Sequence, residues 1–201
     1  MAFKKSIFLF ALIGLLLGFV LDYWITYRPS TLFFPVFIGI FCYLYVLAYN
    51  EENVLRLIGT SLFAALVLSI PTIGINFNEY HQLDFRLISF LIAYPVFIYI
   101  GHCFHYAYHH DNSLELNYST LFAAVWNTIL VLVVATIFAF LSNMLLMLAA
   151  FIFKTVGNLY LWNLFFVGIH FRLILDTTLF FIGVGVAQQN IDIIYNPMAL
   201  S

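Results

Sequence analysis

The stretch LNYSTLFAAVWNTILVLVVATIFAFLSNMLLMLAAFIF, residues 116–153, decides the fold of this chain, because its 38 residues include no Asp, Glu, Lys, Arg or His. A helix crosses the ~30 Å hydrocarbon core of a bilayer with about 20 apolar residues. As one helix, this stretch would be about 57 Å long at ~1.5 Å per residue. It must therefore tilt and project from the bilayer, or break, and Ser142-Asn143 is the expected place for a bend or an exit.

The composition of the whole chain indicates a membrane protein. Of its 201 residues, 65% are hydrophobic and 8% are charged, and the mean hydropathy is +1.05, whereas soluble domains carry about 25% charged residues. In lipid, every peptide group must bond within a helix or a closed barrel. The apolar runs are continuous rather than alternating, which favours helices. The net charge of −2 offers no basic surface for nucleic acid, so membrane lipids are the expected surroundings.

The apolar runs predict an all-α, polytopic membrane protein with six transmembrane helices, at residues 6–25, 31–49, 57–77, 86–106, 118–141 and 169–187. Residues 143–157 are expected to extend the fifth helix. The aromatic segment 159–168 is expected to lie at the membrane interface before the sixth. Pro71 and Pro95 predict a kink and a bend in the third and fourth helices. Residues 1–190 would form one transmembrane domain, and residues 191–201 a short polar tail.

An alternative places a seventh span over residues 144–166. It would hold Lys154 near the middle of the bilayer, at a cost of about 2.5–3.5 kcal/mol on insertion scales. The sequence from Lys154 to Gly157-Asn158 is instead typical of a helix end, with a cation near the terminal carbonyls and a Gly-Asn stop. Six spans are therefore the prediction.

The start of the chain bears on orientation. Lys4 and Lys5 precede an apolar run, as in a signal peptide, but no cleavage pattern appears before Asp22, so we expect an uncleaved first span. Six spans place both termini on one side of the membrane, and the two lysines favour the cytoplasm. The positive-inside rule does not decide the matter, because this placement leaves three Lys or Arg residues inside and four outside.

Small and polar residues suggest where helices pack. Gly14 and Gly18 form a pair four residues apart that would let another helix approach closely, although two glycines are also tolerated in a lipid-facing helix. Asn127 and Ser142-Asn143 are expected to form hydrogen bonds between helices. Cys42 and Cys103 lie in apolar runs and are expected to be buried thiols rather than a disulfide.

Asp176 is the strongest candidate for a functional residue, because an ionisable side chain within a membrane span is a site hypothesis by default. Arg172 lies one turn earlier on the same helix face, and His170 lies on the entry side. The three residues could form a proton or ion path. The alternative is an ion pair, or a protonated Asp176, that only fixes this helix to its neighbours.

A histidine cluster is the second candidate. His102, His105 and His109 fall at i, i+3 and i+7 along one helical stripe, and His105 and His109 have a spacing that can hold a metal. Asp111 or Glu115 would have to complete the coordination sphere, and the Glu of an H-E-x-x-H motif is missing. A pH-sensing role and plain interfacial packing are the alternatives.

Three apolar motifs resemble a known family. They are Tyr118-x-x-Leu-Phe-x-x-x-Trp-Asn127, Leu148-x-x-Phe-x-Phe-Lys-x-x-Gly157 and the run Phe-Phe-Ile-Gly-Val-Gly over residues 180–185. Together they are similar to the bacterial inner-membrane family numbered 4153 among the domains of unknown function, over residues 115–190. The resemblance implies a multi-pass protein of the bacterial cytoplasmic membrane and supplies no activity. Members of that family are usually longer, so the chain resembles a shortened or truncated one.

No catalytic signature accompanies these features: the chain has no G-x-S-x-G elbow and no glycine-rich phosphate loop. We therefore expect a non-enzymatic membrane component without a cofactor, packed against a second copy or another membrane protein. The alternative is a small transporter or permease-like protein that uses the Asp176/Arg172 pair. A metalloenzyme built on His102, His105 and His109 ranks third.

Overall fold

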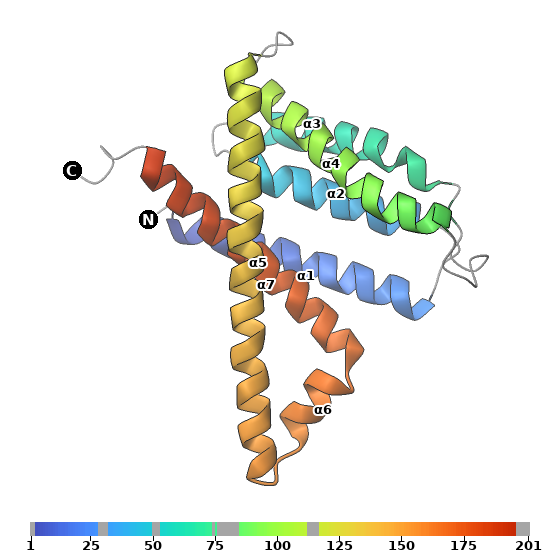
Figure 1. Cartoon of the computed structure of the whole chain (residues 1–201), viewed down its shortest axis with the longest axis vertical. Helices are drawn as coiled ribbons and strands as arrows, with labels where there is room; N and C mark the ends of the chain where they lie inside the picture. Colours follow the sequence, from blue (N-terminus) through green and yellow to red (C-terminus); the bar gives the residue numbers. More distant parts are fainter. Residues whose placement is uncertain are drawn as a thin grey trace. The chain divides into compact units, whose positions relative to one another are not determined.

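The computed structural model describes residues 3–27, 32–49, 53–73, 75, 85–111 and 117–195. Within these residues every regular element is a helix and no strand is present, which confirms the all-α prediction (Figure 1). The elements are α1 (Phe3–Tyr27), α2 (Phe33–Leu47), α3 (Val54–Ser69), the 3₁₀ helix η2 (Ile70–Thr72), α4 (Phe85–Asp111), α5 (Tyr118–Thr155), α6 (Tyr160–Phe166) and α7 (Ile169–Tyr195).

Five of the described helices are long and apolar enough to cross a membrane, one fewer than predicted. They are Ser6–Tyr27, Val54–Thr72, Ser89–His110, Tyr118–Thr155 and His170–Gln189. The expected span over residues 31–49 is only the 15-residue helix α2, which is about 22 Å long against a ~30 Å hydrocarbon core. Seven of its residues are buried, among them Ile40, Leu44 and Val46. Its apolar character is therefore explained by packing inside the protein.

The chain divides into two compact units, which are described separately. The central unit comprises residues 27–128, and the terminal unit comprises residues 1–26 and 129–201. Helix α5 contributes its first residues to the central unit and the rest to the terminal unit.

In the central unit, α2 and α3 share a core formed by Ile40, Leu44, Ala65 and Leu68. The predicted third span continues through Pro71 to residue 77, but α3 ends at Ser69. Proline lacks the N–H that would continue the helix and disfavours helical backbone in the residue before it. The Tyr94 hydroxyl of α4 donates to the Leu68 carbonyl at 2.9 Å, which satisfies an acceptor that the helix end leaves free. The predicted stretch beyond residue 75 lies outside the described residues.

Helix α4 continues further than the sequence predicts. It passes through Pro95 without ending, and it runs beyond the predicted end at Tyr106 to Asp111. The histidine cluster therefore lies on a regular helix and keeps its helical spacing. The Tyr99 hydroxyl of α4 donates to the Val125 carbonyl at 2.8 Å, so α4 is bonded to the first part of α5.

Helix α5 is a single helix of 38 residues, which confirms the extended fifth helix. It continues through Ser142-Asn143, the expected place for a bend or an exit, and the Asn143 amide donates to the Ala139 carbonyl one turn earlier at 3.1 Å. The helix ends as predicted, with Lys154 in its last turn and Gly157 at φ +90°. The Gly157 and Asn158 N–H groups donate to the carbonyls of Lys154 and Phe153 at 3.0 and 2.9 Å, which is the pattern of a Schellman cap.

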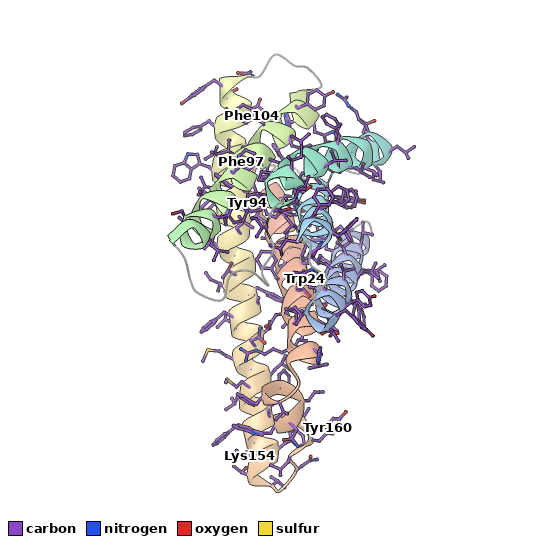
Figure 2. All side chains as sticks on the ribbon, turned by 90° about the vertical axis from the view of Figure 1, so that its right-hand side faces the viewer. Trp24, Tyr94, Phe97, Phe104, Lys154 and Tyr160 are labelled. Atoms are coloured by element: carbon purple, nitrogen blue, oxygen red, sulfur yellow. The ribbon has the colours of Figure 1, made fainter. Side chains whose placement is uncertain are left out.

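The short helix α6 follows this cap and occupies the segment that the sequence assigns to the interface. The Lys154 ammonium lies 3.4 Å from the centroid of the Trp162 ring of α6, which is a cation–π contact. Figure 2 shows Lys154 and Tyr160 at the same end of α5. Lys and aromatic side chains of this kind favour the headgroup level of a membrane.

Helices α1 and α7 pack antiparallel through small residues. A Cβ atom added at Gly14 would lie 2.9 Å from the Phe181 Cβ, and one added at Gly18 would lie 2.7 Å from the Ile174 Cα. Further along, Ser6 accepts a hydrogen bond from Gln189 at 3.2 Å. Helix α1 crosses α5 rather than running beside it (Figure 1). The helix axes of the terminal unit are therefore not all aligned with one another.

The tight α1–α7 contact predicts that Gly18→Val destabilises the protein. The added carbon atoms would meet the backbone of α7, and overpacking of this kind typically costs about 1–3 kcal/mol. We expect a lower midpoint of thermal unfolding in detergent. The matched control is Gly39→Val on α2, where an added Cβ meets nothing within 4 Å. Equal effects of the two substitutions would contradict the packing described here.

Candidate functional site

The Asp176 group of the terminal unit comprises Asp176 and Arg172 of α7 and Asn143 of α5. The Asn143 amide donates to Asp176 Oδ1 at 2.8 Å, and Arg172 Nε lies 3.8 Å from Asp176 Oδ2. The structure thus places the predicted i,i+4 pair together and adds an amide from another helix. The expected hydrogen bond from Asn143 to another helix is confirmed, but sequence spacing could not identify its partner, because this contact joins residues 33 positions apart.

The Asp176 carboxylate is only partly covered by the protein. The side chains of Arg172 and Asp176 are 57% and 43% exposed. Asp176 lies six residues after the start of the candidate span at His170, about 9 Å along the helix, so it lies in the first half of the span rather than near its middle. Thr177 and Thr178 do not supplement the group, because their hydroxyls donate to the Leu173 and Ile174 carbonyls of the same helix.

His170, the third residue of the predicted path, pairs with a residue of α1. Its Nδ1 is hydrogen-bonded to Asp22 Oδ1, and the side chains of His170 and Asp22 are 58% and 23% exposed. From the sequence alone, Asp22 is expected only to lie at the end of the first span. Its partner is separated from it by 148 positions, so no local signal could reveal the pair. Side-chain hydrogen bonds therefore connect α7 to two neighbouring helices, through His170 and Gln189 to α1 and through Asp176 to α5.

Two of the three histidines of the predicted metal site face different neighbours in the central unit, and the Nδ1 atom of the third, His109, is buried without a hydrogen-bond partner among the described residues. His102 Nε2 lies 3.1 Å from the Thr128 hydroxyl of α5, and its ring packs edge-on against Tyr43 of α2. His105 Nε2 lies 3.2 Å from the Thr60 hydroxyl of α3. Among the described residues, no three His, Cys, Asp or Glu side chains gather in a way that could hold a metal ion. The side chains of Asp111 and Glu115 lie outside the described residues. The arrangement gives the metal hypothesis no support.

The remaining predicted packing residues differ in outcome. Gly14 and Gly18 face α7, as described above. Asn127 is not bonded through its carbonyl oxygen, which is buried without a partner in the described part of the chain. Cys42 and Cys103 are free thiols, and both are buried.

A cavity in the central unit was not indicated by any sequence pattern. It has a volume of about 640 Å³ and lies between α3 and α4. Its lining includes His105, which the sequence singled out for another reason, together with Gly59 and Gly101. Glycines and apolar residues at helical spacing are common in any membrane helix, which is why no pattern marked them.

Comparison of the chain with protein-family models, with curated proteins and with solved structures gives no match.

The Asn143–Asp176 contact predicts a measurable coupling between α5 and α7. We expect a double-mutant cycle with Asn143→Ala and Asp176→Ala to give an interaction energy of about 0.6 kcal/mol, with about 1.7 kcal/mol as the upper end for membrane hydrogen bonds. The measurement is the free energy of unfolding in mixed micelles. A cycle with Asn163→Ala, an exposed residue of α6, is the control. Additive effects of Asn143→Ala and Asp176→Ala would refute the coupling.

Proposed function

We propose that this chain is a multi-pass integral membrane protein that acts as a non-enzymatic component, assembled through α7 with another membrane helix. Five helices of sufficient length and apolar character support the membrane part of the proposal. Large apolar side chains are also exposed along the whole of α5, from Phe122 at 52% to Ile152 at 53%. Water would not tolerate a surface of this extent, whereas lipid requires it.

The antiparallel packing of α1 and α7 supports six crossings. Consecutive spans alternate in direction, so a first and a last span that run antiparallel require an even number of crossings in total. The five helices that are long enough to cross give an odd number of crossings. The sixth crossing would be α2, which is too short by length alone, at 15 residues. A short helix can cross where the bilayer thins locally or where the ends are covered by protein. Both termini then lie on one side, which Lys4 and Lys5 suggest is the cytoplasm.

Reporter fusions test this topology. We expect a reporter at the N-terminus and one at the C-terminus to report the same, cytoplasmic side of the membrane, because α1 and α7 are antiparallel. The control is a reporter inserted at residue 30, between α1 and α2, which should report the opposite side. Termini on opposite sides would exclude an even number of crossings.

The observation that favours assembly is the exposure of the Arg172–Asp176 pair. A charged pair within a membrane span faces the interior of a bundle, a water-filled cavity or another protein rather than lipid chains. Asp176 remains 43% exposed although Asn143 and Arg172 contact it. A polar group on a neighbouring helix, from a second copy or from another protein, would cover this face. The half of α5 beyond Asn143 offers a further apolar surface for the same partner.

The bacterial inner membrane is the setting that we propose for this assembly. The proposal follows from the resemblance of residues 115–190 to family 4153. Within this region α5 is one helix. It begins at Tyr118, the first residue of the first motif, and it ends before Gly157, the last residue of the second motif.

Site-specific photo-crosslinking tests the assembly. Phe180 lies one turn after Asp176 on α7 and would be replaced by benzoylphenylalanine. We expect a discrete protein adduct in native membranes, and a reduction of about fivefold when Asp176→Asn is added. Mass and differently tagged copies would distinguish a second copy from another protein. The control position is Phe19 on α1, an apolar residue that is 53% exposed and should yield no discrete adduct.

A transporter remains the second candidate because the same side chains are titratable. Asp22 and His170 meet at one end of α7, and Asp176 lies about 9 Å further along. In that case, purified protein in liposomes would conduct protons or exchange a substrate, and Asp176→Asn would abolish the flux without reducing the amount of folded protein. No adduct at position 180 together with such a flux would replace the assembly proposal.

A further inference from the structure

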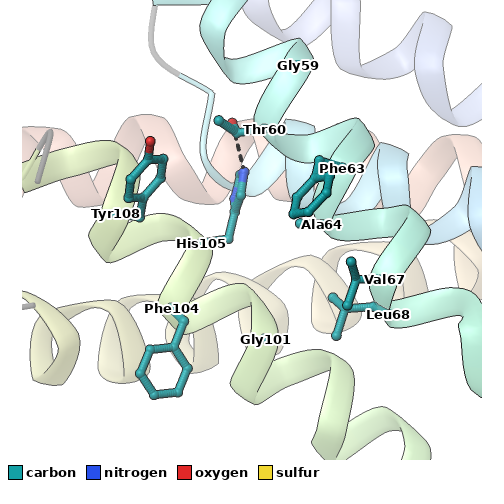
Figure 3. Close-up of a pocket in the computed structure, with 10 residues that line it drawn as sticks. All are labelled: Gly59, Thr60, Phe63, Ala64, Val67, Leu68, Gly101, Phe104, His105 and Tyr108. Atoms are coloured by element: carbon teal, nitrogen blue, oxygen red, sulfur yellow. Dashed lines mark hydrogen bonds between the residues drawn. The ribbon is translucent and has the colours of Figure 1, made fainter. Parts of the chain in front are cut away.

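The cavity between α3 and α4 is lined by ten residues of these two helices. Figure 3 shows the ten residues around it. They are Gly59, Thr60, Phe63, Ala64, Val67, Leu68, Gly101, Phe104, His105 and Tyr108. The α3 residues repeat at intervals of three and four and so form one helix face. A volume of about 640 Å³ is within the usual range of sites for small organic ligands.

Two glycines determine how wide the space is along its length. A Cβ atom added at Gly101 would lie 2.7 Å from the Leu68 side chain, so α4 approaches α3 closely at this end. A Cβ atom added at Gly59 meets nothing within 4 Å, so the other end is open. From Gly59 to Leu68, the α3 side of the lining extends over nine residues, or about 14 Å. The result is an elongated space that narrows towards Leu68.

Polar groups are confined to the open end. His105 is 7% exposed, and its Nε2 is bonded to the Thr60 hydroxyl (Figure 3). The Tyr108 ring lies at the same end, and the guanidinium of Arg56 lies 5.3 Å from its centroid. Towards Leu68 the lining consists of Phe63, Val67 and other apolar groups. The space therefore has one hydrocarbon end and one hydrogen-bonding, cationic end.

We propose that this cavity binds one hydrocarbon chain of a membrane phospholipid, with the phosphate near Arg56 and Tyr108. An elongated apolar space excludes polar substrates, because they would lose their hydration without new hydrogen bonds. A guanidinium and a phenol at the open end suit a phosphate, which accepts hydrogen bonds from both. Arg56 lies in the first turn of α3, where a membrane helix reaches the headgroups. The site is separate from the Asp176 group, and it depends only on the chain being embedded in lipid.

A photoactivatable phospholipid with a diazirine in its acyl chain tests the site in detergent-purified protein. We expect saturable labelling, with adducts mapped to residues 59–68 and 101–108. Gly59→Phe would fill the open end and is expected to reduce labelling at least about fivefold. Gly39→Phe on α2 is the matched control, because it also adds a phenyl group where nothing lies within 4 Å but does not line the cavity. Equal labelling of wild type and Gly59→Phe would overturn the proposal.

Further variants keep the test decisive. If Gly59→Phe does not fold, Val67→Trp fills the same space from an exposed position and should reduce labelling likewise. Arg56→Gln should weaken the phospholipid and leave a photoactivatable fatty alcohol unaffected; equal loss of both would exclude the phosphate contact. Labelling spread evenly over α5 and α7 would mean surrounding lipid only, which overturns the site. Carbonate extraction of the same membranes reports separately on whether the chain is embedded.

Discussion

The peptide groups at the two ends of a helix have no partner within that helix, so the helix ends are the points at which this protein has to supply its own partners. The described structure does so with side chains from neighbouring helices and with turn geometry. Tyr94 donates to the last turn of α3 at Leu68, and Asn158 and Gly157 close the last turn of α5. Tyr99 donates a further hydrogen bond to the Val125 carbonyl of α5. The two tyrosine contacts also fix the position of one helix relative to the next within the central unit.

The polar side chains inside the two units also find their hydrogen-bond partners on neighbouring helices. Asp22, His170, Asp176 and Asn143 all bond across helices in the terminal unit, and His102 and His105 do so in the central unit. Within the described residues, these polar groups thus act first as links between helices. Asp176 and His170 both remain partly exposed after their links are made, but Asp176 lies further into the candidate span than His170, which is what marks it as a candidate for function.

Much of the fold could be predicted from the sequence, because apolar length and helix-stop chemistry are local properties. The cap at Gly157 and the position of Lys154 follow from adjacent residues. The length of α2 could not be predicted, because an apolar run of 19 residues looks alike whether it faces lipid or the core around Ile40 and Leu44. The partners Asn143 and Asp22, and the cavity beside Gly59, depend on contacts between distant residues. A single sequence does not contain that information.

The pairing of α1 with α7 has a consequence for biosynthesis. Gly18 is made 159 residues before Thr177, the residue that covers it, and at ~5–20 residues per second the ribosome needs about 8–30 s to cover that distance. During this interval the first helix exists while its final neighbour does not, so its glycine surface is not yet covered by α7. The contact between α1 and α7 is consequently completed only after residue 177 has been translated, whereas α2, α3 and α4 can associate long before.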